Sequence, residues 1–373
     1  EAARATGPEL AGALMLSGRR LLIGDHNQLP AFDAPRMRTI LSSHALTQTA
    51  LAEAKVLLAP MLDEEWTARL GRLLAADPGD QRATGERAHR LFAPFETLVA
   101  EDERQSRQRV GHRRIAETLT EQRRMDPAIA EIVSKAFYKG DLTTSASRVA
   151  EVEAGASPLR YLAPMTASPI VVVDFPHVSR ARPGEPLAEE EVGRLRNSVE
   201  ADAVMAVLRH VRAAEGKRPT LAILSPYKAQ VEHLQSRLTY GLSRDLKHLD
   251  AFASVRSNGS FVGTIDSFQG NEADLVLLSL VRNNPRTGLG AVGFLREKAR
   301  MNVALSRAKN QLVIVGSLDF LKEAVRGVNP DEEAHSLDFL TDMIVAIEDA
   351  EGRKRKGVRL ATRLPPSALG LTR

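Results

Sequence analysis

The chain has 373 residues, no cysteine, 43% hydrophobic and 4% aromatic residues, and a formal net charge of +4. These values exclude disulfides and cysteine zinc sites, and no apolar run reaches the ~18 residues that a bilayer crossing needs. They favour an α/β protein of two or three domains in the reducing cytoplasm, with no membrane partner, and they permit a nucleic-acid partner without demonstrating one.

The first part of the chain contains one predicted strand and a long helical stretch. Residues 19–25 predict a short strand that ends in a Gly turn, with Gln28 beyond its carboxyl end. The simpler alternative is that Asn27 and Gln28 satisfy a turn. Helix formers dominate from about 33 to 111, which predicts a helical insertion. It is either a subdomain that touches nucleic acid or a packing spacer.

A helix and a linker are predicted next. Pro127 suits a first helical turn, and the apolar spacing that follows it predicts one buried face. Residues 143–169 contain scattered Ser, Gly and Pro with weak periodicity, so we predict a domain linker there.

From Ile170 onward, apolar runs alternate with helical spacings, as in a parallel sheet with flanking helices. Strands are predicted at residues 170–174, 221–224, 261–265, 275–281 and 312–315, and helices at residues 198–212, 296–309 and 338–347. The segment 349–373 contains a basic run, Gly352 to Arg359, and we predict a disordered tail with a phosphate-binding arm as the alternative.

Two polar turns and one helix carry the candidate chemistry. Ser225-Pro-Tyr-Lys-Ala-Gln230 follows a strand at a helix start, where backbone N–H groups suit a phosphate; Tyr227 could instead pack at this corner. Thr264-Ile-Asp-Ser-Phe-Gln-Gly-Asn-Glu-Ala-Asp274 lies beyond the carboxyl end of a strand, where open α/β sheets place ligands. Arg300 and Arg307 are seven apart and should share one helix face, which could be merely a solvated basic face.

In this order, the motifs resemble those of superfamily 1 helicases, in the branch with the nonsense-mediated-decay helicase and the senataxin-like enzymes. The resemblance covers GDHNQLP at 24–30, EQRRMDPAIAEIVSKAFYKGDL at 121–142, SPYKAQ at 225–230, TIDSFQGNEAD at 264–274 and NVALSRAK at 302–309. It implies an α/β fold of RecA-like parallel sheets with flanking helices. Residues 1–142 would be the end of a first RecA-like domain with its helical insertion, 143–169 the linker, 170–348 a complete second RecA-like domain, and 349–373 the tail.

The resemblance implies an ATP-dependent nucleic-acid helicase or translocase, which moves 5′ to 3′ on single-stranded DNA or RNA and hydrolyses ATP between two RecA-like domains. Glu1 and Gln28 would place the attacking water, and Arg124 and Arg307 would reach the γ-phosphate. A frayed terminal residue is the alternative for Glu1.

Further binding residues are implied in the same way. The implied nucleotide-binding residues are Gln122, Arg123, Gly270 and Glu272. Arg123 stands where the family has a tyrosine, although a guanidinium can also lie flat on a purine. The implied nucleic-acid-binding residues are Ser225, Tyr227, Gln230, Thr264 and Ser267.

ATP and Mg²⁺ are the implied cofactors. The sequence contains no G-x-x-x-x-G-K-[ST] loop, so we expect that loop and most Mg²⁺ ligands in an upstream RecA-like segment, in cis or in trans. We therefore predict no metal ligand in this chain and no ATP hydrolysis by residues 1–373 alone. The alternative hypothesis is a non-catalytic nucleic-acid or protein binding module with a relic helicase fold.

Overall fold

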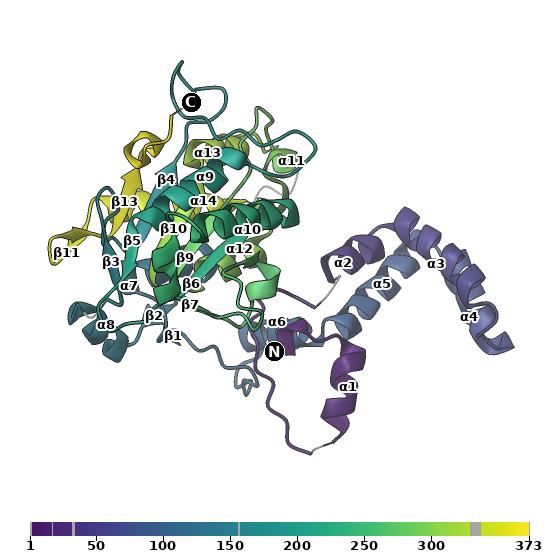
Figure 1. Cartoon of the computed structure of the whole chain (residues 1–373). Coiled ribbons are helices and arrows are strands. Elements are labelled where there is room, and N and C mark those ends of the chain that lie inside the picture. The colour runs from purple at the N-terminus through teal and green to yellow at the C-terminus, as the bar shows by residue number, and fades with distance from the viewer. Residues whose placement is uncertain (1, 17, 32–33, 156, 329–336, 373) are drawn as a thin grey trace. The chain divides into compact units, whose positions relative to one another are not determined.

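The computed structural model describes residues 2–16, 18–31, 34–155, 157–328 and 337–372. The chain divides into two units, residues 1–118 and 119–373 (Figure 1). No helix in these described ranges is both long and apolar enough to span a membrane.

The first unit is helical. Its elements are η1 (Ala2–Arg4), α1 (Gly7–Met15), α2 (Ala34–Ser42), α3 (His44–Leu58), α4 (Glu64–Ala75), α5 (Pro78–Phe92) and α6 (Pro94–Gln108). Asp63 and Asp77 cap α4 and α5 by accepting backbone N–H groups of the first turn. α2 packs against α5, and a Cβ at Gly85 would lie 2.3 Å from the Leu41 carbonyl oxygen, so a glycine permits this close approach.

The strand predicted at residues 19–25 is absent, and the described residues of the first unit contain no strand. One backbone hydrogen bond runs from the Ala2 N–H to the Ile23 carbonyl (2.8 Å). A strand is stable only when neighbouring strands satisfy its backbone groups, so the apolar run remains an extended segment. The residues of the predicted insertion fold into α2 to α6.

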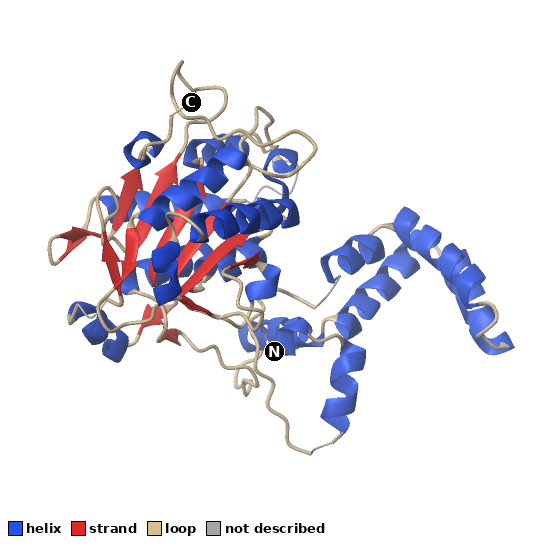
Figure 2. Ribbon diagram, viewed as in Figure 1, coloured by secondary structure: helices blue, strands red, loops and turns tan. Residues whose placement is uncertain are grey.

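The second unit contains a parallel sheet of seven strands (Figure 2). The strands are β4 (Ile170–Asp174), β6 (Thr220–Ser225), β7 (Ala253–Ser254), β8 (Val262–Thr264), β9 (Ala273–Ser279), β10 (Ala308–Gly316) and β13 (Ala361–Leu364). Their order is β13-β4-β10-β9-β6-β7, with β8 also paired to β6, and all these pairings are parallel. The predicted fold class, an α/β fold with a parallel sheet, is confirmed.

Helices cover both faces of this sheet. They are α7 (Pro127–Phe137), α9 (Ser198–Arg209), α10 (Lys228–Leu242), α12 (Lys298–Leu305), α13 (Leu318–Arg326) and α14 (Asp338–Glu351). α9 packs against α10, and α14 packs against α7 and α13. Alternate strand residues such as Val171, Leu277 and Val313 share one core with Val207 and Leu234 of α9 and α10. The intervening residues point to the opposite face, which produces three layers.

The predicted disordered tail is wrong. β11 (Lys354–Arg355) and β12 (Val358–Arg359) form an antiparallel hairpin, and β13 then becomes the edge strand beside β4. Two residues of β13, Ala361 and Leu364, are buried on opposite faces of the sheet, and Arg363 pairs with Asp174 at 3.1 Å. The buried residues of this short strand do not alternate with exposed ones, so its sequence has no pattern that predicts a strand.

The predicted linker also differs from the structure. Residues 143–169 contain β2 (Thr143–Thr144), α8 (Ala146–Glu153) and β3 (Leu159–Tyr161). β2 pairs with β1 (Glu121–Gln122), and β3 pairs with β5 (Val211–Ala213). Residues 119–142 group with the second unit because α7 packs on α14, with the Phe137 and Phe339 ring centroids 5.7 Å apart.

Candidate nucleotide and nucleic-acid sites

Arg124 lies in the turn between β1 and α7, and Gln122 fixes that turn. The Gln122 Oε1 accepts hydrogen bonds from the backbone N–H groups of Arg124 (2.9 Å) and Met125 (2.7 Å). Its Nε2 donates to the Met125 carbonyl (3.1 Å) and to Thr144 Oγ1 (2.7 Å). Both ends of the Gln122 amide are therefore used to position the backbone of Arg124.

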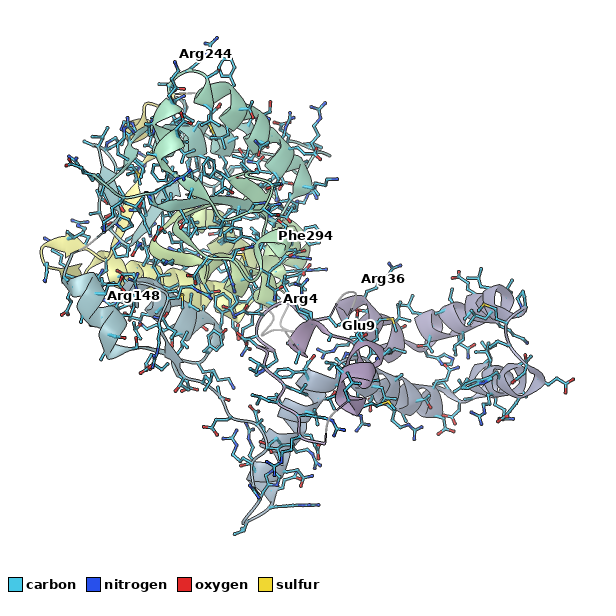
Figure 3. The ribbon with its side chains drawn as sticks, turned by 60° about the horizontal axis from the view of Figure 1, so that its bottom comes forward. Arg4, Glu9, Arg36, Arg148, Arg244 and Phe294 are labelled. Atoms are coloured by element: carbon cyan, nitrogen blue, oxygen red, sulfur yellow. The ribbon has the colours of Figure 1, made fainter. Side chains whose placement is uncertain are left out.

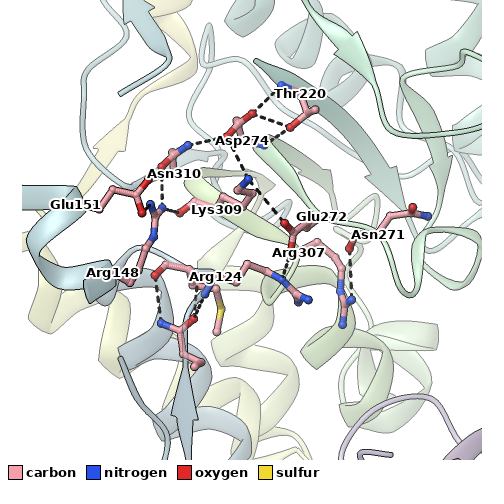
Figure 4. Close-up of polar contacts among 12 residues, drawn as sticks. Arg124, Arg148, Glu151, Thr220, Asn271, Glu272, Asp274, Arg307, Lys309 and Asn310 are labelled. Atoms are coloured by element: carbon pink, nitrogen blue, oxygen red, sulfur yellow. Dashed lines mark hydrogen bonds and ion pairs between the residues drawn. The ribbon is translucent and has the colours of Figure 1, made fainter. Parts of the chain in front are cut away.

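Arg124, Glu272 and Lys309 form a cluster of charges, which we call the Arg124 cluster (Figure 4). Arg124 Nε donates to Glu272 Oε2 at 2.5 Å and Arg124 Nη1 donates to the Ser306 carbonyl at 3.3 Å. Lys309 Nζ lies 3.7 Å from Glu272 Oε1. The Arg124 and Glu272 side chains are 35% and 43% exposed, so a ligand can reach them from solvent.

Arg307 is buried, contrary to the prediction of a ligand-facing helix residue. α12 ends at Leu305, so Arg307 follows the helix and shares no helix face with Arg300. Its guanidinium donates to the carbonyls of Val303 (3.1 Å) and Asn271 (3.4 Å). Arg307 is 2% exposed, and main-chain carbonyls stabilise its charge in this conformation.

The other residues predicted for the nucleotide lie in different environments. The Arg123 side chain is 76% exposed and pairs with Glu121 at 3.0 Å. Gly270 has a φ of +84°, a conformation that glycine adopts without strain. In the first unit, Gln28 Nε2 donates to Asp25 Oδ2 (2.9 Å). Glu1 lies outside the described residues.

Three of the residues predicted to bind nucleic acid are buried instead. Ser225 and Gln230 have no exposed surface, and Tyr227 is 3% exposed. Gln230 Oε1 accepts the Asn197 N–H (2.9 Å), and its Nε2 donates to Ser279 Oγ (3.0 Å). Their side chains hold the strand-to-helix corner together, so direct contact with a nucleic-acid strand does not fit their positions.

Thr264 and Ser267 do reach the surface, and Arg256 joins them in what we call the Ser267 patch. Ser267 Oγ donates to the Thr264 carbonyl (2.8 Å) and accepts from Arg256 Nη1 (2.7 Å). A Cβ at Gly263 would lie 1.9 Å from Arg256 Nη1, so a larger residue there would displace the guanidinium from this position. Sequence reasoning missed Arg256, although it lies in the loop that directly precedes the motif strand.

A buried polar cluster, also missed from the sequence, lies beneath this end of the sheet. Glu200 Oε2 accepts hydrogen bonds from Ser279 Oγ (2.7 Å) and the Val281 N–H (2.8 Å). Asn197 Nδ2 donates to the Val281 carbonyl (3.1 Å). Burial raises the pKa of the Glu200 carboxyl to about 8. The two side chains hold Val281 at a φ of +72°, which is an outlier for a β-branched residue.

Comparison with known proteins establishes the class. Residues 96–319, more than half of the chain, match the AAA domain family, and the chain belongs to it. Its curated relatives include helicases of the nonsense-mediated-decay branch, which confirms the predicted resemblance to that branch of superfamily 1.

Three relatives illustrate this. The DNA polymerase alpha-associated DNA helicase A of Saccharomyces cerevisiae is 35% identical over 35% of this chain and 17% of its own length. The putative regulator of nonsense transcripts 1 of Takifugu rubripes is 29% identical over 52% of this chain and 16% of its own. The DNA replication ATP-dependent helicase/nuclease DNA2 of Gallus gallus is 28% identical over 55% of this chain and 17% of its own length. The chain thus spans less than a fifth of the length of these relatives.

Among solved structures, the C-terminal domain of a possible DNA helicase from Lactobacillus plantarum WCFS1 is similar to this chain. It is 13% identical, with a TM-score of 0.28, over 65% of this chain and 98% of its own.

Proposed function

We propose that this chain is part of an ATP-dependent helicase or translocase that moves 5′ to 3′ on single-stranded nucleic acid in the cytoplasm. In this proposal the second unit is the second RecA-like domain, and the first unit holds the end of the first RecA-like domain with its helical insertion. ATP is hydrolysed between the two domains. Membership of the helicase family supports the proposal.

The Arg124 cluster is the observation that carries the proposal. It combines residues from three separate motifs, and 148 positions in the sequence separate Arg124 from Glu272. Arg124 and Lys309 both contact Glu272, and Lys309 also lies 4.0 Å from Asp274, so Arg124 is a partly exposed cation whose carboxylate partner it shares with a second cation. A phosphate group has the charge and the oxygen geometry to replace Glu272 on the Arg124 guanidinium, because carboxylate and phosphate use the same planar fork of donors.

We propose that the residues of this cluster fit the terminal phosphate of ATP, which supplies the transferable phosphoryl group when bound. Arg124 would stabilise the negative charge that develops on the phosphate oxygens. The proposal also includes Gln28, which would orient the attacking water. Arg307 would be a second arginine at the γ-phosphate. Arg307 must first leave the Val303 and Asn271 carbonyls that it now contacts. No group of three or more possible metal ligands occurs within the described residues, so no residue is assigned to Mg²⁺.

The test of this proposal is ATP turnover in a form of the protein that carries the G-x-x-x-x-G-K-[ST] loop. Arg124→Ala should lower turnover by about 10³-fold or more, as for arginines that stabilise phosphoryl transfer. Glu131→Gln is the matched control, because it removes an ion pair with Arg353 from α7, the helix that follows Arg124, and lies outside the cluster. Equal turnover in the Arg124→Ala variant and the control would contradict the assignment. If the protein binds single-stranded nucleic acid but shows no ATP turnover, the result would support the alternative of a non-catalytic binding module.

The Ser267 patch is the proposed contact with the sugar-phosphate backbone. Thr264 and Ser267 offer hydroxyls, and Arg256 offers a charge, at the carboxyl end of β8. Replacing Arg256 with Ala should weaken single-strand binding and reduce its salt dependence by about one counterion. The exposed Lys217, in the loop before β6, is a control of equal charge.

A further inference from the structure

Phe294 is an exposed aromatic residue whose surroundings fix it in place. It lies in η4 (Gly293–Arg296) and is 43% exposed. The Tyr227 ring packs beside it, with centroids 5.5 Å apart and planes 42° apart. Tyr227 Oη accepts the Phe294 N–H at 3.2 Å, and the Arg300 guanidinium lies 5.0 Å from the Phe294 ring centroid.

A buried ion pair between Arg282 and Glu190 supports the loop that carries Phe294. Arg282 Nε donates to the Ala291 carbonyl (2.8 Å) and lies 3.1 Å from Glu190 Oε2, with both charged side chains at most 10% exposed. Gly293 has a φ of +56°, and a Cβ there would lie 2.6 Å from Tyr227 Oη. These contacts support the loop with Phe294 at its surface.

This support costs stability. A buried ion pair loses the hydration of two charges, and Val281, immediately before Arg282, has a strained backbone that Glu200 and Asn197 hold. Backbone strain persists where the surrounding structure enforces it, and it clusters at functional sites. The ion pair and the strained residue together support a loop whose exposed side chain is an aromatic ring.

Arg300 connects Phe294 to the Ser267 patch. Its Nε donates to Asp266 Oδ1 at 2.7 Å, next to Ser267, while its guanidinium lies over the Phe294 ring. The exposed Phe294 ring is thus adjacent to the Ser267 patch, the proposed contact with the sugar-phosphate backbone. Proteins that bind single strands combine these two elements, because bases stack on aromatic rings while cations and hydroxyls bind the backbone.

We propose that Phe294 is a stacking platform for an unpaired nucleobase of a single strand whose backbone lies on the Ser267 patch. This inference rests on the proposed function. It assigns the aromatic contact that none of the sequence-predicted residues supplies, since Tyr227 is buried and packs beside Phe294. Stacking on an aromatic ring accepts every base, so this contact binds strands without sequence preference.

The test measures binding of labelled single-stranded oligonucleotides by fluorescence anisotropy, with a normal and an abasic oligonucleotide of equal length. Phe294→Ala should weaken binding of the normal oligonucleotide by about 5- to 150-fold, the range that stacking supplies. It should change binding of the abasic oligonucleotide little, because the ring then has no base to contact. Phe294→Tyr should bind both as the unchanged protein does.

Tyr240→Ala is the matched control. Tyr240 is also an exposed aromatic residue, 59% exposed, with the Arg244 guanidinium 4.2 Å from its ring centroid. Figure 3 shows Arg244 and Phe294 at separate parts of the second unit's surface. The control should bind both oligonucleotides normally.

Two results overturn the inference while the proposed function stands: Phe294→Ala binds as tightly as Tyr240→Ala, or it loses equal affinity for the normal and abasic oligonucleotides. If the unchanged protein binds no oligonucleotide even at low salt, the nucleic-acid part of the proposed function fails with it. Circular dichroism of each variant checks the fold, and Phe294→Tyr keeps the comparison valid if the alanine variant unfolds.

Discussion

Glu200 should make the stability of the protein fall as the pH rises through the weakly alkaline range. Its carboxyl is fully buried, and burial raises its pKa from 4.5 to about 8. The folded protein therefore binds a proton that the unfolded chain releases near pH 4.5. Between these values the unfolded state carries fewer protons, so the free energy of unfolding declines with pH. This sign is opposite to that of a paired surface carboxylate.

The magnitude follows from the two pKa values. One pKa unit corresponds to about 1.4 kcal/mol, so the group should lose on the order of 2 to 3 kcal/mol between pH 6 and pH 9. Glu200→Gln keeps the shape of the neutral acid and cannot ionise, so it should not show this loss. The hydrogen bonds from Ser279 and the Val281 N–H remain possible with an amide oxygen.

The assay is urea unfolding of the two proteins at pH 6, 7, 8 and 9, with the difference in unfolding free energy plotted against pH. Other titrating groups cancel in this difference. Glu191→Gln is the control, because hydrogen bonds from Arg196 and Ser198 lower the pKa of the Glu191 carboxyl and it stays ionised throughout. A difference between Glu200→Gln and the unchanged protein that is flat from pH 6 to pH 9 would refute the reasoning.

Three further outcomes are expected. Arg307→Ala should lower the unfolding free energy by about 1–3 kcal/mol in urea titrations, since the buried carbonyls of Val303 and Asn271 lose a donor; unchanged stability would show that these contacts contribute nothing. Leu234→Ala should cost about 2–5 kcal/mol, because Leu234 lies fully buried between α10 and the sheet, whereas the exposed Val345→Ala should cost little. Removing residues 353–373 should expose β4 as an edge strand, lower the melting temperature and cause self-association in size-exclusion chromatography; a monomer of unchanged melting temperature would contradict this.

The sequence predicted the sheet well because strands buried on both faces are continuous apolar runs. β4 has its predicted bounds, and β6, β8, β9 and β10 lie within a few residues of theirs. The run at residues 19–25 looks similar in sequence, but it forms no strand without hydrogen-bonding neighbours. Apolar runs indicate burial, and the pairing that makes a strand is a tertiary property.

The candidate sites were less predictable, because side-chain positions depend on where an element ends. Arg300 and Arg307 share a face only if the helix continues, and it ends at Leu305. Gln230 lies in a motif that suits a phosphate, yet its side-chain amide forms hydrogen bonds with Asn197 and Ser279, which come from distant segments. Glu200 lies on a helix whose spacing shows only an apolar face, so the carboxylate gave no signal of its burial.

The place of β4 in the sheet has a consequence for how the protein is made. Of the seven strands, β4 is synthesised first, and its two neighbours, β10 and β13, follow at residues 308–316 and 361–364. Its buried valines therefore leave the ribosome well before either partner exists. Such long-range pairing folds slowly, and an unpaired apolar strand invites intermolecular contacts. The nascent chain should need chaperone protection from the emergence of Ile170 until β13 has emerged.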